Sequence, residues 1–336
     1  MSGWMNPFDG ITFVVIVVAL AWTYDFFNGM NDAANAIATT VSTRALSPSQ
    51  AIALARTMNV VGAFVSTAVA KTVGKGIVDP AVMDQVVVIS SLVGACVWAA
   101  ACTFTGIPIS ITHSLVGGLV GAAIAAHGFG VVKVAGMKKV VVAMVLSPTL
   151  GFVGGFILLV IVYWAVKDFA PTKVNKFFRF GQIASASFMA LTHGTNDTQN
   201  AMGIITAALL VGGFIKDFHV PAWVIVGSAL FMGFGTSVGG WRVIRTMGMR
   251  MVKLRPVHGF TAEFSAGVVI LVASLLGAPI STTHVISTAI MGVGATHRLS
   301  AVRWGVAFHI VVTWILTIPG AALVGAGTFE LLKLIL

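Results

Sequence analysis

Long apolar runs with almost no charge restrict the fold of this chain more than any other feature of its sequence. The blocks at residues 10–22, 86–102 and 140–166 belong to segments long enough to cross a bilayer as helices. Only 9% of the residues are charged, against roughly 25% in soluble domains. The 37 glycines fit the same class, because small residues let membrane helices pack closely. We therefore expect an all-α polytopic membrane protein.

Two polar motifs interrupt the apolar runs, and each of them occurs twice. "NGMNDAANA" at 28–36 and "HGTNDTQNA" at 193–201 share Gly-x-Asn-Asp-x-x-Asn-Ala, 165 residues apart (28 to 193). "GIPISITH" at 106–113 returns as "GAPISTTH" at 277–284, 171 residues apart (106 to 277). Two motifs in the same order and at nearly constant spacing indicate a duplicated unit.

The apolar segments predict five crossings in each half of the chain. They are expected at 10–44, 50–70, 85–104, 106–127 and 138–166, and then at 182–214, 221–241, 259–276, 278–297 and 302–329. Because five is odd, the second half enters from the opposite face, which gives the inverted-topology repeat of secondary transporters. The predicted units are a first repeat at 1–166, a basic cytoplasmic linker at 167–181 and a second repeat at 182–336. The first and fourth crossings of each half carry the polar motifs, so we expect broken or re-entrant helices there, with Gly29 and Gly194 allowing the breaks in the first crossings.

The loop charges predict how the chain is oriented in the cell (inner) membrane. Twelve of the 20 Lys and Arg residues fall on one predicted face: Arg44, Lys167, Lys173, Lys176, Arg179, Arg242, Arg245, Arg250, Lys253, Arg255, Arg298 and Arg303. Under the positive-inside rule this face is cytoplasmic, and both termini are extracytoplasmic. Lys133, Lys138 and Lys139 fit least well, because they gather on the outer face. The membrane accounts for the net charge of +10, so no nucleic-acid partner is expected.

Acidic residues at apparent membrane depth are candidates for carrying a cation. They are Asp25, Asp32, Asp197 and Glu263. A carboxylate at the bilayer centre costs about 2.5–3.5 kcal/mol, so each is expected to face a cavity, a cation or a partner. A structural hydrogen bond is the alternative, chiefly for Asp25. We assign cation coupling to Asp32, Asn35, Asp197, Asn200 and Glu263.

The Gly-x-Pro-Ile-Ser motif predicts a helix end that binds an anion. Gly and Pro interrupt the apolar run, and Ser110 or Ser281 then starts a helix whose free N–H groups and dipole attract negative charge. Hydroxyl and amide groups assigned to the anion are those of Ser110, Thr112, Ser281, Thr282, Thr283, Asn31 and Asn196. The alternative is a pair of ordinary Pro-kinked helices with capping serines.

The histidines near these motifs have open roles. His113 and His284 follow the hydroxyls at matching positions. They either contact the anion or move protons, or they are structural, with a ring nitrogen bonded to a backbone carbonyl. His193 stands where the first copy has Asn28, so no role common to both copies is expected there. Because no histidine pair has convincing metal-ligand spacing, no resident metal or cofactor is expected.

The chain resembles the inorganic phosphate transporter (PiT) family, bacterial low-affinity type, over nearly its whole length. The resemblance is carried by the paired "NGMNDAANAIAT" and "HGTNDTQNAMGI", each followed by Pro-Ile-Ser-x-Thr-His. The resemblance implies an inverted-repeat, usually dimeric secondary transporter that moves phosphate with Na⁺ or H⁺. It also implies that Asp32 and Asp197 belong to the ion-coupling region. Ser110 and Ser281, with the neighbouring threonines, would then lie at the phosphate.

One departure from the family pattern bears on the coupling cation. The Na⁺-coupled branch typically has a glutamate in the helix after each Asn-Asp motif; Glu263 matches the second, and Asn59 stands at the first. Losing a hard-cation ligand favours H⁺ coupling over Na⁺ coupling. The predicted function is symport of inorganic phosphate, alone or as a divalent-metal complex. A sulfate transporter or an anion channel are the alternatives, and no enzyme is expected, since no nucleophile-base pair is evident.

Overall fold

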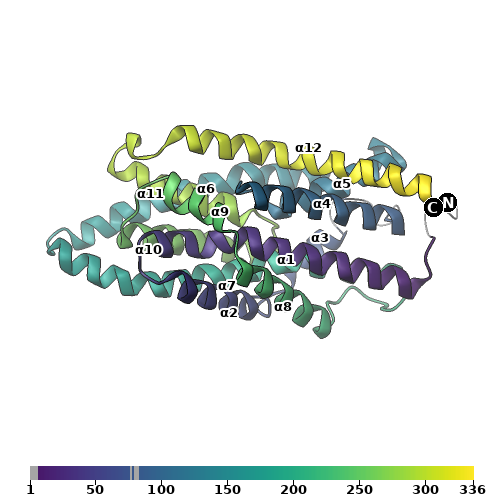
Figure 1. Ribbon diagram of the computed structural model, residues 1–336, viewed down its shortest axis with the longest axis horizontal. Helices are drawn as coiled ribbons and strands as arrows, with labels where there is room; N and C mark the ends of the chain where they lie inside the picture. The colour runs from purple at the N-terminus through teal and green to yellow at the C-terminus, as the bar shows by residue number, and fades with distance from the viewer. Residues whose placement is uncertain (1–6, 76–77, 79–82) are drawn as a thin grey trace.

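The computed structural model describes residues 7–75, 78 and 83–336 (Figure 1). Within these residues the fold consists of helices joined by turns and loops, with an isolated bridge between Val78 and Val132. The helices are α1 (Gly10–Ser42), α2 (Pro48–Gly62), α3 (Ala68–Lys75), α4 (Gln85–Thr105), α5 (Ile111–His127), α6 (Val134–Val166), α7 (Pro171–Val211), α8 (Ala222–Val238), α9 (Trp241–Arg245), α10 (Pro256–Leu275), α11 (Thr282–His297) and α12 (Trp304–Ile335). The expected all-α class is confirmed. The predicted side for the N-terminus concerns residues 1–6, which lie outside the described range.

The helices differ in whether they can cross a bilayer alone. Five of those described are long and apolar enough, namely α1, α4, α6, α10 and α12. In addition, α8 and the segment 241–250 are bent by 63° relative to each other, as in a broken span or a re-entrant loop. In contrast, α2, α5 and α11 have only 15, 17 and 16 residues, and about 20 are needed. Three of the ten expected crossings therefore fall on short helices: α2 at the second crossing of the first half, and α5 and α11 at the fourth crossings, where broken or re-entrant helices were expected.

The helices that carry the Asn-Asp motifs are not broken. α1 and α7 continue through Gly29 and Gly194 as uninterrupted helices of 33 and 41 residues, so the expected breaks there are wrong. Both glycines instead permit close packing. A Cβ at Gly29 would lie 2.1 Å from the carbonyl oxygen of Met232 in α8, and one at Gly194 would lie 2.2 Å from that of Asn59 in α2.

The expected breaks at the Gly-x-Pro-Ile-Ser motifs are present. α4 ends at Gly106 and α10 is followed by Gly277, with φ values of 82° and 69°, a region that favours glycine. After each break a new helix is capped by serine: the Ser110 hydroxyl accepts from the backbone of α5 at 3.1 Å, and the Ser281 hydroxyl accepts from that of α11 at 3.2 Å. α5 and α11 are therefore short helices whose N-termini lie inside the protein.

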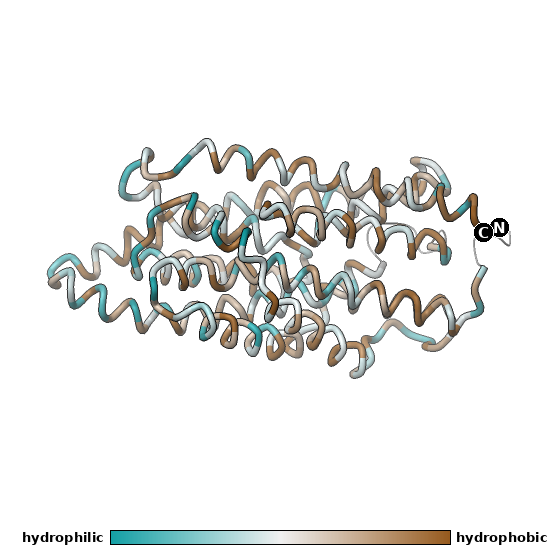
Figure 2. The backbone as a smooth tube through the Cα atoms, in the orientation of Figure 1, coloured by the Kyte–Doolittle hydropathy of each residue, from teal (hydrophilic) through white to brown (hydrophobic). Residues whose placement is uncertain are grey.

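The bundle is elongated along the helix axes (Figure 1). The first residues of α1 and the last residues of α12 lie at one end, and the junction of α6 with α7 extends beyond the other helices at the opposite end. Figure 2 shows hydrophilic residues at that junction and mostly apolar residues along the helices. The segment 167–181, expected as a linker, is for the most part the first turns of α7.

Two apolar clusters lie on either side of the polar motifs. In α1, Phe13 to Tyr24 contribute to the first cluster and Ala34 to Ala38 to the second. In α7 the order is reversed: Phe178 to Ala190 belong to the second cluster and Ala201 to Leu209 to the first. The two Asn-Asp motifs therefore lie between the clusters, and α1 and α7 pass through them in opposite directions.

Candidate functional site

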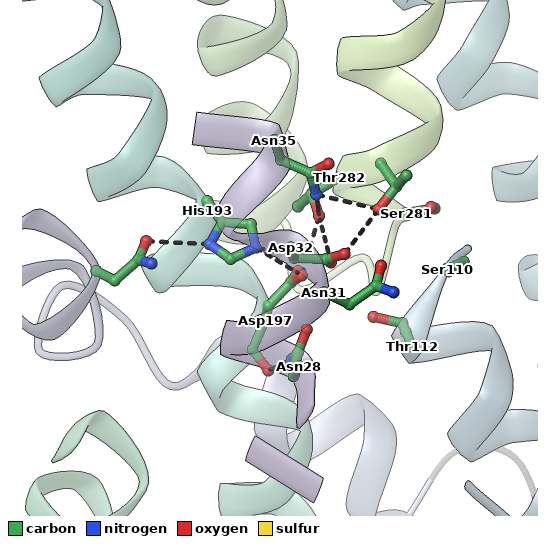
Figure 3. Close-up of polar contacts among 12 residues, drawn as sticks. Asn28, Asn31, Asp32, Asn35, Ser110, Thr112, His193, Asp197, Ser281 and Thr282 are labelled. Atoms are coloured by element: carbon green, nitrogen blue, oxygen red, sulfur yellow. Dashed lines mark hydrogen bonds and ion pairs between the residues drawn. The ribbon is translucent and has the colours of Figure 1, made fainter. Parts of the chain in front are cut away.

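The two Asn-Asp motifs face each other from the middle of α1 and α7, which pack together. Asn31, Asp32, Asn196 and Asp197 are all at most 1% exposed. Figure 3 shows the two carboxylates between His193 on one side and the Ser110 and Ser281 helix ends on the other. Groups separated by 165 residues in sequence are thus brought into a single buried site.

The threonines of α11 contact both carboxylates. The Thr282 hydroxyl lies 2.9 Å from Asp197 Oδ2, and the Thr283 hydroxyl lies 3.1 Å from Asp32 Oδ1. The Asn35 amide donates to both hydroxyls, at 3.2 and 3.0 Å. The second Gly-x-Pro-Ile-Ser motif therefore supplies hydroxyls directly at the acidic pair.

The contacts between motifs are reciprocal. Asn35 of the first Asn-Asp motif bonds threonines of the second Pro-Ile-Ser motif, while Asn200 of the second Asn-Asp motif donates to Thr112 of the first, at 2.9 Å. The central asparagines behave alike: Asn31 donates to the hydroxyl of Thr103 in α4 at 2.9 Å, and the amide of Asn196 lies 2.8 Å from the hydroxyl of Ser274 in α10. Thr103 and Ser274 keep the same spacing of 171 (103 to 274) as the second motif.

His193 is the principal residue that the sequence reasoning missed. Its Nε2 lies 3.2 Å from Asp197 Oδ2 and 3.7 Å from Asp32 Oδ2. Its Nδ1 lies 3.0 Å from Asn59 Oδ1, and the Asn59 amide nitrogen donates to the hydroxyl of Thr236 at 3.0 Å. The first copy of the motif, with Asn28 at this position, gave no indication of such a role. The usable signal was the i,i+4 spacing of His193 and Asp197, which puts them on one helix face.

These contacts leave a place for a proton between the imidazole and the carboxylates. The Thr236 hydroxyl donates to a carbonyl of its own helix, so it accepts from Asn59, and the Asn59 oxygen faces the His193 ring. Nδ1 is then a donor, because an amide oxygen only accepts. Nε2 faces carboxylate oxygens, which also accept unless protonated. A proton on Nε2 or on its carboxylate partner would let these atoms bond to each other.

A cation can occupy the same place as this proton. Ligand atoms of Asp32, His193 and Asp197 all lie within 4.8 Å of one another, a spacing that suits a metal ion. Carboxylate and amide oxygens are the ligands that hard cations prefer. A proton and a metal cation are therefore alternatives at this point.

Glu263 forms a separate polar cluster. Its Oε1 accepts from Thr39 at 2.5 Å, from Thr40 at 2.9 Å and from Gln182 at 3.0 Å, and its Oε2 accepts from Ser185. Thr39 lies seven residues, or about 10 Å, beyond Asp32 along α1. Glu263 is thus saturated with donors at a distance from the acidic pair. Asp25 also lies away from the pair, seven residues before Asp32 in α1, and no hydrogen-bond partner is found for its carboxylate among the described residues.

Asn59 and Glu263 are not equivalent positions, contrary to the sequence expectation. Asn59 lies in α2 and contacts His193, whereas Glu263 lies in α10 and contacts α1 and α7. The spacing that relates Gly106 to Gly277 matches α10 with α4 instead of α2. Asn59 and Glu263 therefore lie on helices that do not correspond to each other in the two halves.

His113 and His284 lie together, with ring centroids 5.1 Å apart, and His284 stacks on Trp314 at 3.9 Å. No hydrogen-bond partner is found for any of their four ring nitrogens among the described residues. The structural alternative, a ring nitrogen bonded to a backbone carbonyl, is therefore not found for either histidine. That His113 and His284 contact the anion or move protons stays a prediction.

Comparison with known proteins identifies the family of this chain. The phosphate transporter family matches residues 28–172 and 167–325. A probable low-affinity inorganic phosphate transporter of Bacillus subtilis is 45% identical over 97% of this chain and 98% of its own. One of Rhizobium meliloti is 44% identical over 93% and 94%. A solved structure described as a sodium-dependent phosphate transporter superposes with a TM-score of 0.87 at 28% identity, covering 97% of this chain and all of that one. The chain belongs to the phosphate transporter family.

Proposed function

We propose that this chain is a secondary active symporter that moves inorganic phosphate together with H⁺, with Na⁺ as the less favoured cation. The observation that carries the proposal is the meeting of Asp32 and Asp197 with the Thr282 and Thr283 hydroxyls and the proton position at His193. An anion and a positive charge have binding groups within one buried site. Moving them together lowers the net charge that crosses the membrane.

The phosphate would bind at the N-termini of α5 and α11. A helix N-terminus presents free N–H groups and the positive end of the dipole, and Thr112, Thr282, Asn31 and Asn196 add hydroxyl and amide donors around it. The acidic acceptors also favour phosphate over sulfate, because phosphate at neutral pH keeps a hydrogen that can be donated to a carboxylate. A complex of phosphate with a divalent metal would need the same groups.

Proton coupling rests on His193 and Asn59. The hydrogen bonds from Thr236 through Asn59 leave a position for one proton between the imidazole and the acidic pair. The relative of known structure is described as sodium-dependent. In this chain a proton and Na⁺ would compete for the space among Asp32, His193 and Asp197.

Alternating access would follow from two inverted repeats, 1–166 and 182–336, moving against each other in the cell membrane. What supports this is the opposite order of apolar clusters along α1 and α7 and the reciprocal contacts of Asn35 and Asn200. The start of α1 and the end of α12 lie at the same end of the bundle. The loop charges favour an extracytoplasmic position for that end.

Uptake of labelled phosphate into proteoliposomes tests the proposal. Imposed H⁺ and Na⁺ gradients are applied separately, with sulfate as a competitor. We expect accumulation that follows the pH gradient and resists excess sulfate. Uptake that ignores both gradients rules out symport, and strong competition by sulfate rules out the assigned anion. Full uptake by Asp32→Asn or Ser281→Ala removes the site assignment.

A further inference from the structure

A groove on the outside of the bundle is distinct from the site described above. It runs between α6 and α10 and has a volume of about 800 Å³. Apolar side chains line most of it, among them Val142, Leu146 and Leu150 of α6 and Val268, Val272 and Leu276 of α10. The residues 277–280, which connect α10 to α11, form one of its walls. Its size is that of a pocket for one elongated small molecule.

Positive charge is concentrated at one end of this groove. Lys138 and Lys139 line it, and both are exposed. A smaller cavity of about 120 Å³ shares Thr72, Lys139 and Pro279 with it and adds Lys133. Within the described part of the chain, none of these three lysines forms an ion pair with a carboxylate. The groove is therefore apolar along its length and cationic at its mouth.

We propose that this groove binds an anionic phospholipid, with an acyl chain between α6 and α10 and the headgroup phosphate at Lys138 and Lys139. α6 has 33 residues and is about 50 Å long, well above the roughly 30 Å of hydrocarbon in a bilayer. We place its first turns at the headgroup level, where lysines extend their charge to the interface. The proposal accounts for three lysines on the face that the positive-inside rule leaves with fewer charges.

The charge, and not the apolar wall, must select this lipid. Lipid tails are as apolar as leucine, so burying one in the groove gains little over leaving it in the bilayer. Each lysine near the headgroups strengthens the binding of an anionic lipid by about fivefold. Two lysines thus give a preference of roughly 25-fold over a zwitterionic lipid of the same chain length.

Residues 277–280 connect the groove to the substrate site. Residues 277–280 line it, Ser281 then caps α11, and Thr282 contacts Asp197. Thr72 in α3 donates to the carbonyl of Gly277 at 2.8 Å, at the edge of the same groove. A bound lipid therefore packs against the segment that presents α11 to the acidic pair, and transport is expected to be faster when it is bound.

Lipid retention on the purified full chain tests the proposal. The delipidated protein is titrated with phosphatidylglycerol or phosphatidylcholine of equal chain length and bound lipid is counted by native mass spectrometry. The double variant Lys138→Gln/Lys139→Gln should lose the preference for phosphatidylglycerol by roughly 25-fold. Lys216→Gln, which removes an exposed lysine away from the groove, should keep it. An unchanged preference in the double variant overturns the proposal.

Two further arms identify the occupant. Ala143→Trp fills the groove and leaves both lysines in place; it should lose phosphatidylglycerol, whereas an anion site without a tail would not be affected. If inorganic phosphate displaces the lipid, or if Ala143→Trp changes the fraction of dimer and not lipid retention, the proposal is wrong. Because this test measures lipid binding and not transport, a negative result would not bear on the proposed symport.

Discussion

Replacing His193 by asparagine, the residue that the first motif has at the matching position, removes the imidazole that lies beside both Asp32 and Asp197. Nε2 of His193 lies 3.2 and 3.7 Å from the two carboxylates, and the ligand atoms of all three residues lie within 4.8 Å of one another. Two negative charges at that distance repel by about 3.5 kcal/mol at an effective dielectric constant of about 20. Since about 1.4 kcal/mol corresponds to a factor of ten, proton-driven uptake should fall by about two to three orders of magnitude.

The assay for His193→Asn is phosphate uptake into Na⁺-free proteoliposomes under an imposed pH gradient. His258→Asn is a matched control, because His258 is also buried but is bonded to Tyr163 at 2.7 Å, away from the acidic pair. It should keep most of its uptake. Adding Na⁺ should restore part of the uptake of His193→Asn, because the two carboxylates then gain a cation. Wild-type uptake by His193→Asn without Na⁺ would refute the reasoning.

Three other substitutions have defined outcomes. Asp32→Asn should reduce uptake under either gradient by at least about 100-fold, because the coupling cation loses a buried carboxylate partner, at a cost of about 3–5 kcal/mol. Unchanged uptake would count against the site. Thr282→Val should weaken the apparent phosphate affinity by about tenfold, measured as a higher KM, because one hydroxyl is lost; a change in maximal rate alone would mean that the hydroxyl does not bind phosphate. Gly194→Ala should lower the melting temperature and the free energy of unfolding, the latter by about 1–3 kcal/mol, because its Cβ would lie 2.2 Å from a carbonyl oxygen. Gly130→Ala is the control, because a Cβ there would meet nothing within 4 Å. Equal melting temperatures for the two variants would contradict the packing.

Local sequence signals were sufficient for the helical class and for the breaks at Gly106 and Gly277. Apolar length and the Gly-x-Pro sequence act within a few residues, so no knowledge of neighbours is needed. The uninterrupted course of α1 and α7 was not predictable in this way. Whether a glycine breaks a helix or admits a neighbour depends on the backbone that approaches it, here Met232 at Gly29 and Asn59 at Gly194.

The candidate site was predictable where the duplication marked it. Asp32, Asp197 and the α11 threonines were expected as functional residues because both motifs recur, and the structure brings them together. His193 breaks the symmetry of the repeat, so an argument from repetition passed over it. Its contact with Asn59 spans 134 residues, and no spacing in the sequence announces it.

The most direct test of the account measures phosphate and proton entry together. Proteoliposomes with an internal pH indicator receive labelled phosphate without Na⁺, and uptake and internal acidification are recorded in the same sample. The account predicts that the two rise in a fixed ratio, and that both are lost in His193→Asn. Phosphate accumulation that needs a Na⁺ gradient and is accompanied by no proton entry would contradict it.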